Sequence, residues 1–76
     1  MSVVKRSVKI AGHSTSITLE EPFWDALCDI AKSREMPVYL LIEEIDSERS
    51  NNNLSGAIRI FILQHIQKKL HDATTA

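Results

Sequence analysis

The sequence has one cysteine, two prolines, two glycines and few aromatic residues, 5% of its 76 positions. A single cysteine, Cys28, cannot form an intrachain disulfide, and its apolar helical neighbours favour a structural thiol over a reactive one. The three histidines are too far apart in sequence for the ligand spacing of a zinc site, so no metal is predicted. A chain this short buries a small share of its surface and needs further support. With disulfide and metal set aside, we expect that support to be self-association into an obligate homodimer.

Other absences narrow the function. No apolar run approaches the roughly 18 residues of a membrane span, and no charged-then-apolar leader is present, so we expect a cytoplasmic protein with no membrane partner. The sequence also lacks a glycine-rich phosphate loop, a nucleophile elbow and a supported Ser/His/Asp arrangement. A small hydrolase using His13 or His65 therefore has no supporting constellation. We expect no enzyme activity, no catalytic residue and no cofactor.

Charge is unevenly distributed, although the formal net charge is only −1. Residues 1–19 carry Lys5, Arg6 and Lys9 with no acid, whereas residues 20–76 carry 6 basic and 10 acidic groups, a balance of −4. A basic arm on an acidic body indicates a polyanion partner. Two copies would present six such cations, which we expect to contact the phosphate groups of such a polyanion.

Two N-terminal segments have the composition and the alternation of β-strands. Residues 3–10 and 14–19 are rich in Val, Ile, Thr and Ser, and the glycine at position 12 provides a turn between them. The strand region as a whole covers residues 3–19. In the second segment Thr15, Ile17 and Leu19 share one face, which suits a core.

Helical spacing follows in three segments, predicted at about 21–34, 37–48 and 54–71. Pro22 suits the start of the first helix and Pro37 the start of the second, while Asn53 is a good cap for the third. The predicted fold class is mainly α with a short N-terminal β-ribbon or hairpin, in a single domain over residues 1–76. The residues after 71 are expected to fray.

Three motifs together resemble a known family. The run KRSVKIAGHSTSITLEEPFWDALCDIA, the later LLIEEID and then NLSGAIRIFIL are similar to a bacterial subfamily of ribbon-helix-helix domains with an added third helix. The resemblance covers roughly residues 5–66. It implies an intertwined homodimer in which residues 14–19 of the two chains pair antiparallel, and a ribbon that enters the DNA major groove.

The resemblance also implies roles for particular residues. Alternate ribbon side chains would face the bases, and backbone amides at the start of the second helix would hold a phosphate. The base-facing residues would be Ser14, Ser16 and Thr18. The phosphate-binding amides would be those of Pro37, Val38 and Tyr39, although Pro37 has no N–H to donate. Because the three base-facing side chains carry only hydroxyl groups, we expect phosphate contacts to contribute more to DNA binding than base contacts do.

The apolar positions at strand and helix spacing are the expected dimer core. They are Thr15, Ile17, Leu19, Trp24, Leu27, Leu41, Ile45 and Phe61. The favoured function is a homodimeric regulator of transcription that binds double-stranded DNA. The alternative is an adaptor or antitoxin-like dimer that binds another protein through its apolar third helix.

Overall fold

The computed structural model describes residues 3–48 and 53–75, with side chains through residue 72. Two strands precede three helices: β1 (Val3–Ile10), β2 (His13–Glu20), α1 (Glu21–Ser33), α2 (Val38–Glu48) and α3 (Leu54–Thr75). This antiparallel hairpin followed by three helices confirms the predicted fold class. The structure contains one chain and does not test the predicted dimer.

The hairpin is tightly connected. Its two strands pair over their whole length, from Val3 opposite Glu20 to Ile10 opposite His13. The two turn residues, Ala11 and Gly12, both have positive φ, 52° and 84°. That combination is typical of the two-residue turn whose twist matches a β-hairpin. Glycine adopts it freely, whereas an alanine there costs about 1 kcal/mol.

The helices begin and end for local reasons. Pro22 lies in the first turn of α1, and Glu35, with a φ of 55°, follows the end of that helix. Pro37 accepts the first bonds of α2 through its carbonyl, from the N–H groups of Leu40 and Leu41, so α2 starts one residue later than expected. The Asn53 side chain accepts the Gly56 N–H at 2.6 Å, which confirms Asn53 as the cap of α3.

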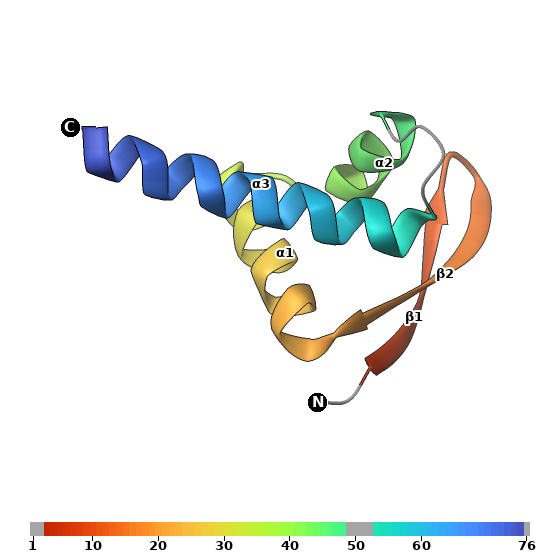
Figure 1. Cartoon of the computed structure of the whole chain (residues 1–76). Helices are drawn as coiled ribbons and strands as arrows, with labels where there is room; N and C mark the ends of the chain where they lie inside the picture. Colours follow the sequence, from red (N-terminus) through yellow and green to blue (C-terminus); the bar gives the residue numbers. More distant parts are fainter. Residues whose placement is uncertain (1–2, 49–52, 76) are drawn as a thin grey trace.

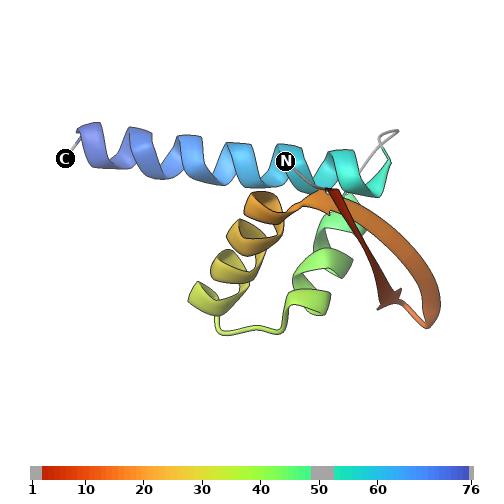
Figure 2. The ribbon, with the colours of Figure 1, turned by 90° about the horizontal axis from the view of Figure 1, so that it is seen from below.

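The third helix is longer than its sequence pattern indicated. It continues to Thr75, although fraying was expected after residue 71, so that expectation was wrong. Figure 1 shows α3 crossing the molecule, with its C-terminal end projecting beyond the other elements. Figure 2 shows α1 and α2 side by side on one side of α3, with the hairpin beside α2.

One hydrophobic core joins all five elements. Its buried residues are Ile10, Ile17, Leu19, Leu27, Ile30, Ala31, Leu41, Ile42, Ile45, Ala57, Ile58 and Ile62. Of the eight residues predicted for a dimer core, five are therefore already buried within one chain, while Thr15, Trp24 and Phe61 are half-buried. A single chain thus covers most of the apolar positions from which self-association was predicted. The dimer itself stays a prediction.

Apolar surface remains on the outer side of α3. Ile60, Leu63, Ile66 and Leu70 are between 45% and 65% exposed. Exposed apolar stripes of this kind mark contact surfaces in soluble proteins. Within the part of the chain that the structure describes, no helix is both long enough and apolar enough to cross a membrane.

Candidate nucleic-acid interface

The exposed face of the hairpin is built by alternation in both strands. Successive side chains of a strand point to opposite faces, and residues opposite each other across a ladder share a face. The register places Lys5 opposite Thr18, Ser7 opposite Ser16 and Lys9 opposite Ser14. All six of these residues are exposed, and together they are the ribbon face: Lys5, Ser7, Lys9, Ser14, Ser16 and Thr18.

The ribbon face contains the three predicted base-facing residues and adds three from β1. The view that this surface offers only hydroxyls was incomplete, because Lys5 and Lys9 lie on it as well. Lysine is one of the side chains that contact guanine edges in the major groove. The signal was present in the sequence, since positions 5, 7 and 9 alternate with the apolar positions 4, 8 and 10.

Arg6 lies on the opposite face of the hairpin, away from the two lysines. Its Nη2 is 3.2 Å from Oε1 of Glu21, and its guanidinium carbon lies 4.4 Å from the centroid of the Trp24 ring. Its Nη1 is buried and has no hydrogen-bond partner. The electron-rich face of the indole stabilises this cation in place of water. Arg6 is therefore engaged inside the molecule, and the exposed cations of the arm are Lys5 and Lys9.

No acid belongs to the ribbon face as defined, but Glu20 lies at its margin. Arg59 holds this carboxylate, with Nε and Nη2 each 3.0 Å from Oε1. Donation from its own backbone N–H and then from Arg59 lowers the pKa of Glu20 below its ordinary value. The negative charge is thereby compensated beside the ribbon face.

The outer edge of β2 is closed by α3. The Thr18 N–H donates to Oγ of Ser55 at 3.0 Å, and Nη2 of Arg59 donates to the Thr18 carbonyl at 3.3 Å. Sequence reasoning missed Ser55 and Arg59, because 37 and 41 residues separate them from Thr18 and no local pattern connects such distant positions. These contacts fix the ribbon against the helical body.

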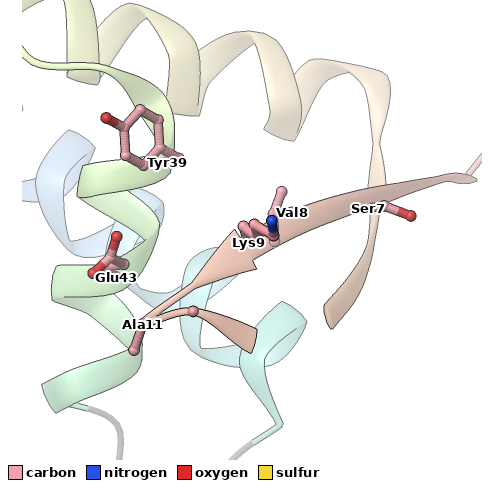
Figure 3. Close-up of a pocket in the computed structure, with 7 residues that line it drawn as sticks. Ser7, Val8, Lys9, Ala11, Tyr39 and Glu43 are labelled. Atoms are coloured by element: carbon pink, nitrogen blue, oxygen red, sulfur yellow. The ribbon is translucent and has the colours of Figure 1, made fainter. Parts of the chain in front are cut away.

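A groove of about 530 Å³ lies between β1 and α2. It is lined by Ser7, Val8, Lys9, Ala11, Gly12, Tyr39 and Glu43. Figure 3 shows Tyr39 and Glu43 along α2, across from Lys9 and the turn at Ala11. The structure thus brings Lys9 and Tyr39, two of the residues predicted to contact phosphate, to one groove.

The start of α2 has features for and against a bound phosphate. The first intrahelical donor is Leu40, so the N–H groups of Val38 and Tyr39 precede the helical ladder, as they would at an anion site. Glu43, however, adds a negative charge to the same groove, which opposes an anion. The phosphate role of Val38 and Tyr39 stays a prediction.

The remaining polar candidates do not gather into a site. Among the described residues no three His, Cys, Asp or Glu side chains come together as metal ligands would. Cys28 is half-buried, and its pKa is raised, chiefly by burial and also by the nearby Asp25 and Asp29 carboxylates. A raised pKa keeps the thiol protonated at neutral pH, as a structural cysteine would be.

Comparison with known proteins agrees with the hairpin and the helices. A solved structure of an uncharacterized protein from Bordetella pertussis Tohama I superposes with a TM-score of 0.79 at 30% sequence identity. The match covers 93% of this chain and 61% of that one. No curated protein matches the sequence. The profile of the ribbon-helix-helix domain matches residues 3–66, most of the chain. This chain therefore belongs to the ribbon-helix-helix domain family.

Proposed function

We propose that this chain is a homodimeric, DNA-binding regulator of transcription that places its ribbon face in the major groove. Ribbon-helix-helix domains are generally DNA-binding regulators that act as dimers. The observation that carries the proposal is the ribbon face itself, two lysines and four hydroxyls on one exposed surface. A two-stranded ribbon fits the width of the major groove. The proposal places the protein in the cytoplasm, where bacterial DNA is, and includes no catalytic step.

The two kinds of side chain have separate tasks in this proposal. The ammonium groups of Lys5 and Lys9 contact phosphates and, where they reach a guanine, donate hydrogen bonds to its acceptor atoms. Ser14, Ser16 and Thr18 supply donors and acceptors that fit several bases, so they contribute preference more than strict selection. Arg6 has no place in this interface because Glu21 and Trp24 already hold it.

The salt dependence of DNA binding tests the proposal. Each phosphate contact contributes roughly −0.9 to the slope of log affinity against log salt concentration. A dimer whose four ribbon-face lysines contact phosphates should therefore show a slope of about −4. The six cations counted from the sequence alone would give a slope of about −5. We expect fluorescence anisotropy with a labelled duplex to show the shallower slope. The double variant Lys5→Ala/Lys9→Ala should flatten it toward zero.

The chain offers a matched control. Lys68 and Lys69 are also exposed lysines, but they lie on the projecting part of α3. Lys68→Ala/Lys69→Ala removes the same charge and should leave the slope unchanged. Equal losses in the two double variants would reduce the effect to net charge, and no loss in the first would exclude the ribbon face as the DNA surface.

A second candidate function is the binding of a protein partner through α3. The observation that favours it is the exposed apolar stripe of Ile60, Leu63, Ile66 and Leu70. An apolar helix contact depends little on salt, whereas DNA binding depends on it steeply. A pulled-down protein that stays bound at high salt and is lost in Leu63→Lys would support this candidate without touching the ribbon face.

A further inference from the structure

The N-terminal end of α3 lies beside the hairpin (Figure 1) and contacts the edge of β2 at Thr18. The Thr18 N–H donates to Oγ of Ser55 at 3.0 Å, and the Thr18 carbonyl accepts from Nη2 of Arg59 at 3.3 Å. A neighbouring antiparallel strand would bond the same two groups of the backbone. Two side chains of α3 therefore lie where a further strand would pair, and we call them the edge clamp: Ser55 and Arg59.

The register of the hairpin shows that this edge of β2 faces away from β1. Because both backbone groups of Thr18 bond to α3, Thr18 and Lys5 form a pair without mutual hydrogen bonds, and such pairs alternate along an antiparallel ladder. Ser14 and Ser16 belong to the same set, so their backbone groups point to the outer edge as well. Among the described residues, hydrogen bonds at this edge are made by Thr18 and by neither serine.

The edge clamp is reached by water, and Arg59 has other partners. Its Nε donates to Oε1 of Glu20 at 3.0 Å, and its guanidinium carbon lies 5.8 Å from the centroid of the Phe23 ring. The Arg59 side chain is 34% exposed, and Ser55 is half-buried. Water or another backbone can therefore replace the bonds to Thr18 while Arg59 keeps its other two contacts. The clamp can open at Thr18 without unfolding of α3.

We propose that the edge clamp is an autoinhibitory contact, which closes β2 in the single chain and has to open before β2 pairs with β2 of a second copy. This inference rests on the dimer in the proposed function and on the pairing of residues 14–19 expected from the sequence. A ladder through Thr18 and the bonds to α3 require the same N–H and the same carbonyl. The clamped monomer and the paired dimer therefore exclude each other at this residue.

The edge clamp gives the third helix a regulatory role. An unpaired strand edge is a template for pairing with other chains, and a helix that covers the edge prevents it. The bonds of the clamp stabilise the monomer alone, so they oppose dimer formation. A DNA duplex that binds the paired ribbons selects the open form and shifts the equilibrium toward the dimer. The start of α3 thereby sets the protein concentration at which the dimer forms.

Removal of the clamp hydroxyl tests the inference through the dissociation constant of the dimer. Ser55→Ala removes the acceptor of the Thr18 N–H and destabilises the clamped monomer, whereas the paired dimer does not use that hydroxyl. One hydrogen bond changes an equilibrium roughly fivefold, and two clamps open per dimer, so we expect Kd to fall about tenfold or more. Analytical ultracentrifugation over a concentration series measures Kd. Ser55→Thr keeps the hydroxyl and should retain the wild-type value.

Two arginines provide a matched pair for the other half of the clamp. Arg59 and Arg34 each bond a glutamate and lie 5.8 Å from the centroid of a phenylalanine ring. Arg59 also bonds the Thr18 carbonyl, whereas Arg34 follows the C-terminal end of α1. We expect Arg59→Ala to lower Kd of the dimer and Arg34→Ala to leave it unchanged. Ser33→Ala is the control for Ser55→Ala, because the Ser33 hydroxyl donates to a backbone carbonyl within α1.

Hydrogen exchange of single amides reports on the clamp without a dimer. In dilute wild-type protein the Thr18 amide should exchange more slowly than the Ser16 amide, because Ser55 accepts its hydrogen bond. Ser55→Ala should bring the two rates together in the monomer. Both amides should be slowed when the dimer forms. Equal rates in the wild-type monomer would show that the clamp does not form in solution and would overturn the inference.

The remaining outcomes separate this inference from the proposed function. A dimer that is weakened or left unchanged by both Ser55→Ala and Arg59→Ala would contradict the inference and leave the dimer in place. A chain that stays monomeric in every variant, with or without DNA, would remove the dimer from the proposed function and the inference with it. The salt slope of DNA binding would still report on the ribbon face. Circular dichroism of each variant checks that the fold is retained.

Discussion

The two faces of the hairpin are made from the same two strands but differ in burial and in the polarity of their side chains. The inner face contributes Ile10, Ile17 and Leu19 to the core, whereas the ribbon face carries lysines and hydroxyls in water. Arg6 is instructive because it has the charge of one face and the position of the other. Its contacts with Trp24 and Glu21 show that position in the strand, more than residue type, decides what a cation does here.

The largest expected effect comes from moving a charge to the inner face. Ile17 is 1% exposed, so Ile17→Lys buries an ammonium group without a partner, at a cost of several kcal/mol. A domain of this size has a total stability of roughly 4–11 kcal/mol. We expect the variant to lose its cooperative thermal transition by circular dichroism.

The neighbouring position provides the control for that substitution. Ser16→Lys introduces a lysine at the adjacent position, on the ribbon face, and should change the free energy of unfolding by no more than about 0.5 kcal/mol. It should also steepen the salt dependence of DNA binding, because it adds a cation to the proposed interface. If both lysines were tolerated, the inner face would not be part of the core.

An intermediate effect should separate two adjacent cations. Arg6→Ala removes the contact with the Trp24 ring and a partly exposed ion pair, so we expect it to lower the free energy of unfolding by about 1–2 kcal/mol. Lys5→Ala should cost no more than about 0.5 kcal/mol. Chemical denaturation measures both.

DNA binding should rank the same two variants in the opposite order. Lys5→Ala changes two phosphate contacts in a dimer and should make the salt slope less negative by about 2. Arg6→Ala should leave the slope unchanged in protein that remains folded. A slope that responds equally to both would mean that Arg6 leaves Trp24 when DNA binds.

The smallest effect concerns the margin between the faces. The pKa of Glu20 is lowered in the folded chain, so its ionised form contributes stability above its unfolded-state pKa, and this is lost as pH falls through the lower folded pKa. We expect a small drop in melting temperature below about pH 4.5, the ordinary value of a Glu. Glu20→Gln should remove that part of the pH profile. An unchanged profile would show that Arg59 does not stabilise the carboxylate.

Much of the candidate site could be predicted from local patterns. Alternation in the two strands specifies which side chains share a face once a strand is assumed, and it placed Ser14, Ser16 and Thr18 correctly on an exposed surface. The same alternation in β1 places Lys5 and Lys9 on one face and Arg6 on the other. The net charge of the segment does not contain this distinction, so it gives three cations for the interface where the ribbon face has two. The helices could also be located from spacing, with errors of one residue at the end of α1, one at the start of α2 and four at the end of α3.

The sequence by itself determined the family, the hairpin and the apolar stripes, since these depend on residues close together in the chain. Tertiary structure alone decided that Arg6 lies on Trp24, that Ser55 and Arg59 bond to the edge of β2 at Thr18, and that a groove lies between β1 and α2. Periodicity defines the face of an element and says nothing of which distant element packs against its edge. That choice depends on how the whole core is packed, and it determines which surfaces of the hairpin stay exposed.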